Sequence, residues 1–523
     1  MGDKLFIGYP GFFVHKVNID GAASPVNFGA RGGNGATSGA TIPRDIGTVM
    51  RSGHRTFHCI QSWIGHARAH GTKGLQQLDI AEQQAGLSSE RVSATAWLLL
   101  AVLFVAYICS TLDRFVISLL IEPIKHDLRL SDTQISLLQG LAFSLIFALT
   151  TLPVGYLVDR VSRTRLIAVG IAFWSLMNSF CGLSASFPHI FLARAGVGVG
   201  EASLSPAAYS LISDTFPKHR YGLALGIFAA GGSMGSGLSL VIGGFVIAAI
   251  MKFGAVTVPL VGELQPWQTS FIVISAPGFL LALIMLWLRE PPRHAPKPGN
   301  SRAPDRSLLW RFLRKQRLTL VLHHLAVGIT NMTIVGALAW IAPLFMRVHG
   351  WSVNQAGLGV GLAILFGSSI GLLGGGALSD AAMKRGPHWR LIVCAGSTFL
   401  AAGFAMSYPL VSSPMLAIML YGCVAMLSII PSGVANAALQ FITPSSIRGK
   451  ISSYYLFTVG MLNIIGPTLI AVVADRYFPS HDGIRFALAI VLPSSLILAC
   501  ILFLLTARIY RFEPIEDEQA ATP

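Results

Sequence analysis

The stretch that decides the fold spans Gly155–Arg165 and reads GYLVDRVSRTR, directly after a long apolar run. Its Gly-x-x-x-Asp pattern at 155–159 recurs at 376–380, which is 221 residues later. A second pair of short segments lies at nearly the same separation: PKHR at 217–220 and PSSIR at 444–448, each after an apolar run. Paired landmarks at one separation indicate a duplicated structural unit.

Outward from this stretch, apolar runs of about 20 to 28 residues recur from about residue 95 onward. Each is long enough, at ~1.5 Å of rise per residue, to cross a hydrocarbon layer ~30 Å thick. The sequence therefore predicts an all-α membrane protein with twelve transmembrane helices in two pseudo-symmetric six-helix bundles. The predicted cores are 96–121, 134–157, 165–185, 188–213, 221–250, 268–288, 318–346, 353–378, 390–409, 414–441, 451–474 and 484–507.

The composition excludes a water-soluble protein. Of the 523 residues, 53% are hydrophobic and only 12% are charged, whereas soluble proteins carry about 25% charged residues. One hydrophobic core cannot bury so much apolar surface, because cores stop growing near ~250 to 300 residues. The six cysteines show no CxxC spacing, so we expect neither a disulfide framework nor a metal site.

The composition also divides the chain into segments. Residues 1–93 are rich in Gly, Ser, Arg and His and lack helical periodicity, so we expect a disordered extension or a start assigned too far upstream. Two six-helix bundles are expected at 94–288 and 318–508. The segment between them, 289–317, carries nine Lys/Arg against two acids and is interpreted as a cytoplasmic linker, and 509–523 as an acidic tail.

The net charge of +15 is a topology signal. From residue 94 onward there are 29 Lys/Arg, of which 21 fall on the side that holds both termini and six on the other side. This bias follows the positive-inside rule, so we expect a multi-pass protein of the cell membrane, the inner membrane in a bacterium, with both termini cytoplasmic. A basic surface for nucleic acid is not needed to explain the charge.

The same sorting isolates four charged residues well inside helices: Asp113, Arg114, Arg194 and Glu201. A charge at a helix centre costs at least ~2.5 kcal/mol, so unpaired placement is disfavoured. The estimated depths along the predicted helices are similar, which favours pairing. One interpretation is a structural ion-pair cluster. The other is that the acids bind and release protons while the arginines hold an anion or tune the carboxylates.

GYLVDRVSRTR resembles the loop signature of the major facilitator superfamily, with Ser162 in place of the usual glycine. The resemblance covers about residues 95–510 and has a degenerate second copy at 376–380. Within the superfamily, STLDRF (110–115) and RAGVGVGEAS (194–203) resemble the spinster family, whose members export lysophospholipids and sphingosine phosphates. An Asp-Arg pair in the first helix is also usual in organic anion:cation symporters.

The resemblance implies that Asp113, Arg114, Arg194 and Glu201 form the proton and headgroup network. The corresponding helices of the second half offer Asn331, Tyr421 and Asn436, with Thr330 and Gln440 nearby, to the same cavity. It also implies a cytoplasmic latch of Gly155, Asp159, Arg160, Arg163 and Asp214, with Asp380 in the degenerate copy. From this we hypothesise that the charged first half takes a polar headgroup and the nearly uncharged second half an apolar tail.

We therefore expect a secondary transporter that works by alternating access, coupled to protons, with a lipid-like amphipathic or organic-anion substrate. A proton symporter of small carboxylates is an alternative, and a non-transporting receptor or scaffold with the same fold is a second. No Walker A or GxGxxG sequence and no nucleophile-and-base constellation occurs, so neither an enzyme nor a cofactor is indicated. The expected partners are substrate, protons and membrane lipids, with no nucleic acid, and the chain is expected to be a monomer.

Overall fold

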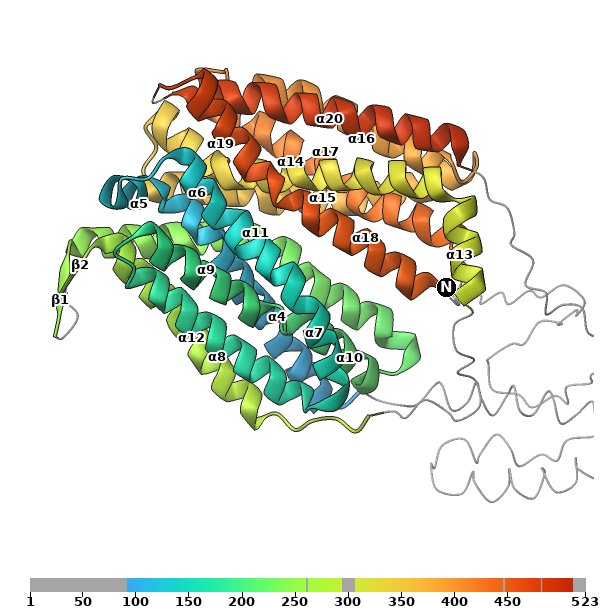
Figure 1. Ribbon diagram of the computed structural model, residues 1–523, viewed down its shortest axis with the longest axis horizontal. Helices are drawn as coiled ribbons and strands as arrows, with labels where there is room; N and C mark the ends of the chain where they lie inside the picture. Colours follow the sequence, from blue (N-terminus) through green and yellow to red (C-terminus); the bar gives the residue numbers. More distant parts are fainter. Residues whose placement is uncertain (1–91, 260–261, 294–305, 445–446, 481, 511–523) are drawn as a thin grey trace, which may run out of the picture. The chain divides into compact units, whose positions relative to one another are not determined.

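A computed structural model describes residues 92–259, 262–293, 306–444, 447–480 and 482–510 (Figure 1). Most of the expected extension (1–93) and tail (509–523) lies outside these ranges, as do residues 294–305 of the expected linker (289–317). The described residues are helical apart from a short hairpin and the connections. Eleven helices are long and apolar enough to cross a membrane, and the twelfth crossing is divided into α9 and α10. The predicted twelve-helix fold is confirmed.

The N half contains the first six crossings. Its elements are α4 (Ala94–Phe115), η1 (Val116–Leu119), α5 (Ile121–Leu128), α6 (Asp132–Gln139), the π-helical η2 (Leu141–Leu145), α7 (Ile146–Arg160), α8 (Arg163–Gly182), α9 (Phe187–Glu201), α10 (Leu204–Thr215), α11 (Lys218–Phe253) and α12 (Pro266–Trp287). Strands β1 (Val256–Val258) and β2 (Gly262–Leu264) pair antiparallel between α11 and α12. Composition gave no sign of this hairpin.

The C half contains the other six crossings. Its elements are α14 (Arg317–His349), α15 (Val353–Met383), α16 (Trp389–Ser407), α17 (Pro414–Ile442), α18 (Arg448–Asn463), α19 (Ile465–Tyr477) and α20 (Gly483–Ile509). They are preceded by α13 (Arg306–Lys315), which falls in the expected linker and buries Leu308, Leu309 and Phe312 against α14 and α17. Leu308, Leu309, Phe312 and Leu313 recur at helical spacing and give α13 an apolar face, and this explains why the segment packs.

Serine caps fix where several helices begin. The Ser131 side chain accepts from the backbone of Gln134 at the start of α6, and the Gln134 side chain accepts in return from the Ser131 backbone. Ser352 and Gln355 form the same capping box at the start of α15. Each box satisfies backbone N–H groups that have no partner within the helix. These boundaries therefore follow from local sequence.

Consecutive crossings alternate in direction, so the bundle has two ends. We call the end at which α4 begins the basic face, and the end that carries the β-hairpin the hairpin face. The N and C halves approach each other closely through glycines of α11 and α15. A Cβ atom on Gly237 would lie 2.6 Å from the Gly361 carbonyl oxygen, and one on Gly357 would lie 2.5 Å from the Leu240 carbonyl oxygen. Only glycine allows this backbone contact between the halves.

Candidate substrate and proton site

The structure brings together the four charged residues that the sequence singled out within α4 and α9. Arg114 Nη2 donates to Glu201 Oε2 at 2.6 Å, and the two residues form a salt bridge. Arg194 donates to the backbone carbonyls of Asp113 and Arg114, at 3.0 and 3.3 Å. Asp113 and Glu201 are each 2% exposed and Arg194 is fully buried. The Arg194 guanidinium therefore binds the backbone of α4, and the Arg114 guanidinium binds the Glu201 carboxylate.

Three further residues complete this cluster, and sequence analysis did not single them out. Ser110 donates to Glu201 Oε2 at 2.7 Å, and Asn178 of α8 donates to Asp113 Oδ1 at 2.7 Å. The Phe143 ring, carried by the π-helical η2, lies 4.5 Å from the Arg114 guanidinium and 5.6 Å from that of Arg194. Asn178 is a lone amide in an otherwise apolar run, which is a signal that the sequence offered.

Exposure differs sharply within the Arg114–Glu201 pair. The Arg114 side chain is 27% exposed, whereas the Glu201 side chain is completely buried. Glu201 Oε1 and Arg114 Nε have no hydrogen-bond partner among the described residues. Of the two charges, the guanidinium is therefore the one that a solute can reach.

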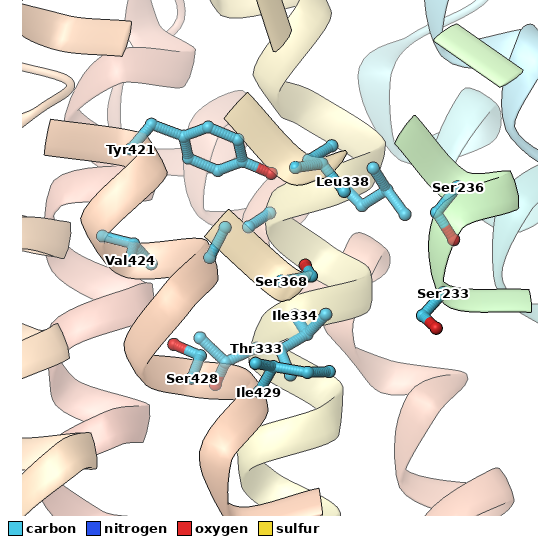
Figure 2. A pocket seen from close by; sticks show the side chains of 13 residues that line it. Ser233, Ser236, Thr333, Ile334, Leu338, Ser368, Tyr421, Val424, Ser428 and Ile429 are labelled. Atoms are coloured by element: carbon cyan, nitrogen blue, oxygen red, sulfur yellow. The ribbon is translucent and has the colours of Figure 1, made fainter. Parts of the chain in front are cut away.

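A largely apolar cavity of about 100 Å³ is lined mainly by residues of the C half. Figure 2 shows Tyr421 of α17 and Leu338 of α14 on one side, with Ser233 and Ser236 of α11 facing them. Thr333, Ser368 and Ser428 also line it. Among the described residues no charged side chain lines this cavity.

The polar residues expected in the C half are not all brought to the cavity. Tyr421 lines it. Asn331 instead donates to the Val327 carbonyl of its own helix, and Asn436 accepts from Gln440. Thr330 is fully buried and donates to Ala326. Asn331 and Asn436 are not among the residues that line the cavity.

Helix α11 connects the cavity with the charged cluster. Ser239 of α11 donates to Thr111 of α4, at 3.2 Å. One turn earlier, Ser236 faces the cavity. Thr111 directly follows Ser110, the donor to Glu201. Helix α11 therefore contacts α4 beside the charged cluster and also lines the cavity.

At the basic face, Arg163 is the centre of a second cluster. It forms an ion pair with Asp214 and donates to Glu290 Oε1 at 2.7 Å. Partial burial acts to raise the pKa of Glu290, but hydrogen bonds from Thr164, Arg163 and Ser162 outweigh it and lower this pKa to about 2. Glu290 follows the sixth crossing by three residues and was not anticipated.

The remaining residues of the expected latch do not join the Arg163 cluster. Asp159 and Arg160 are exposed at the end of α7, and the backbone carbonyl of Asp159 accepts a hydrogen bond from Arg293. Gly155 is exposed, and a Cβ there would meet nothing within 4 Å. Asp380 is also exposed. The motif residues therefore lie at an open surface of the basic face.

At the hairpin face the two halves are joined by an ionic cluster around Arg347 of α14. Arg347 Nη1 and Nη2 donate to the two Asp132 oxygens at 2.7 and 2.8 Å, and Nε donates to Glu122 at 2.6 Å. Lys125 donates to the same Asp132 at 2.6 Å. Nearby, Asp475 of α19 accepts from the backbone and hydroxyl of Thr133. These contacts hold the hairpin face closed.

The sequence matches the Major Facilitator Superfamily over residues 103–467. An MFS-type efflux pump of Mycolicibacterium smegmatis is 26% identical over 81% of this chain and 95% of that protein. A probable L-galactonate transporter of Escherichia coli is 29% identical over 64% and 72%. A bacterial homologue of the human lysosomal transporter spinster, solved inward-facing and unoccupied, is 25% identical with a TM-score of 0.67, over 80% and 96%. The chain thus belongs to the Major Facilitator Superfamily, as a spinster-like multi-pass membrane transporter rather than an enzyme.

Proposed function

We propose that the protein is a proton-coupled transporter of amphipathic anions, with the headgroup at Arg114 and the apolar chain in the cavity between α11, α14, α15 and α17. The observation that carries this proposal is the Arg114–Glu201 pair, in which Arg114 is reachable and Glu201 is buried. An anion that enters the site competes with Glu201 for the guanidinium.

This competition determines whether the proton and the anion cross the membrane in the same direction or in opposite directions. When an anionic headgroup takes Arg114, the Glu201 carboxylate keeps only the Ser110 hydroxyl as a hydrogen-bond donor. A buried carboxylate without its cation is costly, so a proton binds to Glu201 as the anion binds to Arg114. Proton and anion then bind in the same state and cross together, which makes the protein a symporter.

The cavity lining supports an apolar chain. Ser236 and Thr333 donate back to carbonyls of their own helices, at 3.1 and 2.8 Å, so their donors are already used. What the cavity mainly offers to a ligand is methyl and methylene surface from residues such as Leu338 and Ile364. A polyhydroxy chain needs free donors and acceptors, whereas an acyl chain needs only this surface.

A proton symporter of small carboxylates is the second candidate. It is favoured by the resemblance to a probable L-galactonate transporter, and the same Arg114 would bind the carboxylate. Under this alternative the apolar cavity contributes little to affinity. The two candidates differ in whether removal of the chain abolishes transport.

Orientation and conformation follow from the charges. The basic face is proposed to be cytoplasmic in the cell membrane, with both termini on that side and the chain monomeric. The Arg347 cluster then lies on the outer side, so the proposed state is closed outward. Residues Asp159, Arg160, Arg163, Asp214, Gly155 and Asp380 are proposed to close the cytoplasmic side in the opposite state, with the 94–288 and 318–508 bundles rocking around the site.

The test compares oleoyl lysophosphatidic acid with glycerol 3-phosphate, which has the same headgroup without a chain. Thermal-shift titration of the purified protein is followed by flux into proteoliposomes at two external pH values. Chain-dependent, pH-driven flux is expected. Equal transport of glycerol 3-phosphate would favour the carboxylate-type symporter.

Two variants then test the coupling residues. Asp113→Asn and Glu201→Gln should each remove the pH dependence of flux, whereas Glu263→Gln, on the exposed strand β2, should leave it intact. If both buried variants keep the pH dependence, the proposed coupling site is wrong.

A further inference from the structure

Helix α8 forms a third wall of the charged cluster, besides α4 and α9. Trp174 and Asn178 lie one turn apart on the same face of α8, and both are fully buried. Asn178 Nδ2 donates to Asp113 Oδ1 at 2.7 Å. Asn178 Oδ1, by contrast, has no hydrogen-bond partner among the described residues. A buried amide with one bound and one free end is unusual, because buried polar atoms are generally paired.

The neighbours of Asp113 leave its carboxylate to Asn178. Arg194 of α9 donates to the Asp113 backbone and not to its carboxylate. Arg114 is paired with Glu201. The Trp174 indole faces the same carboxylate, but among the described residues its Nε1 completes no hydrogen bond of normal length and angle. Cys109 of α4 and Cys181 of α8 are the other titratable groups that face Asp113.

An acid that takes up and releases a proton in a dry site needs a partner that suits both of its forms. A carboxylate only accepts hydrogen bonds, whereas a carboxylic acid also donates one. An arginine or lysine suits the charged form alone. An asparagine carries a donor and an acceptor side by side on one planar amide, so it matches the carboxylate through Nδ2 and the acid through Nδ2 and Oδ1 together.

We propose that Asn178 is a positioning residue for proton exchange at Asp113. Its Nδ2 holds the carboxylate, and its free Oδ1 accepts from the hydroxyl that forms when a proton binds to Asp113 Oδ2. The protonated state is then a two-bond acid–amide pair. This inference rests on the proposed role of Asp113 as a proton-binding group. It adds that Asn178 of α8 helps to set the pH at which Asp113 exchanges its proton.

The test reads the acid directly and needs no substrate. The carboxylic-acid carbonyl band of the purified, reconstituted protein is titrated with pH by infrared difference spectroscopy, and Asp113→Asn identifies the band of Asp113. Asn178→Leu, of similar size but without donor or acceptor, should move this band to higher frequency. It should also shift the pH at which half of the band is lost, because leucine removes one charge-assisted bond from the carboxylate and two neutral bonds from the acid, and these losses differ in free energy.

Two further variants keep the result interpretable. Asn178→Ser retains a hydroxyl that donates and accepts, so it should lie between wild type and the leucine variant, and it carries the test if the leucine variant does not fold. Ser179→Ala is the matched control, because Ser179 is the next residue on α8 and pairs with Ser275 of α12. It should leave the band unchanged.

The outcomes separate the two proposals. An Asp113 band that keeps its frequency and midpoint in both Asn178 variants overturns the role of Asn178 while leaving the proposed function standing. If Asp113→Asn removes no titrating band, Asp113 does not exchange protons, and the proposed role of Asp113 fails together with this inference.

Discussion

Replacement of Arg347 should release the hairpin face. Arg347 makes three charge-assisted hydrogen bonds across the two halves, two to Asp132 and one to Glu122. The Arg347 side chain is 4% exposed, that of Asp132 7% and that of Glu122 32%. Removing one partner of a buried ion pair costs about 3 to 5 kcal/mol. The lower end applies, because Lys125 still neutralises Asp132 and Glu122 is partly hydrated.

A loss of about 3 kcal/mol in the closed state alone corresponds to a shift of more than 100-fold in the ratio of closed to open molecules. Spin labels at His126 and Ser412, exposed at the hairpin face of the N and C halves, report this ratio by double electron–electron resonance in a background without native cysteines. Arg347→Gln should move the distance distribution from one short distance toward a longer one. The control Lys125→Gln removes a cation that bonds only within the N half, and it should change the ratio less than about threefold.

The reasoning is refuted if Arg347→Gln leaves the distance distribution of wild type. It is also refuted if Lys125→Gln shifts the distribution as much, because net charge at the hairpin face, rather than the bridge between halves, would then control opening. A thermal unfolding curve of each variant identifies any general loss of stability.

Three further predictions concern other parts of the bundle. The pKa of Glu290 in the folded protein is lowered to about 2. The stability that its carboxylate contributes is therefore complete above the unfolded pKa and is lost only as pH falls from ~4.5 to 2. Glu290→Gln should lower the melting temperature equally at pH 5.5 and 7.5, and a difference between the two pH values would contradict the lowered pKa. Gly237→Ala places a Cβ 2.6 Å from the Gly361 carbonyl and should cost about 1 to 3 kcal/mol in thermal stability, whereas Gly226→Ala on the same helix, which meets nothing within 4 Å, should cost none. Ala425→Leu adds bulk to the cavity and should weaken binding of oleoyl lysophosphatidic acid at least about tenfold in thermal-shift titration; unchanged affinity would remove the chain from this cavity.

The helices were predictable because their signal is local. A run of apolar residues long enough to cross the bilayer must form a helix, since no water is present to bind the backbone. Predicted spans such as 414–441 and 484–507 match α17 and α20 within two residues. The breaks within crossings were missed: the π-helical η2 and the interruption between Glu201 and Leu204 leave no mark in hydropathy.

In the candidate site, too, some features were predictable from the sequence and others were not. Arg194 and Glu201 stood out in the sequence because charge within a membrane helix is rare. Their actual bonds did not follow from the sequence. Arg194 binds backbone carbonyls rather than the Asp113 carboxylate, and Asn178 binds that carboxylate instead. Asn331 and Asn436 form hydrogen bonds within their own helices. The periodicity of the sequence cannot show whether such a side chain bonds within its helix or faces the cavity.

Residue type and spacing along one chain were enough to indicate the membrane fold, the duplicated halves, the superfamily and the four charges within helices. The tertiary structure alone decided which charge meets which, how Asn178 and Phe143 complete the cluster, and that Arg347 bridges Glu122 and Asp132 from more than 200 residues away. Hydrogen bonds act over about 3 Å, and their partners are fixed by how helices pack and rotate against each other, not by their distance in sequence.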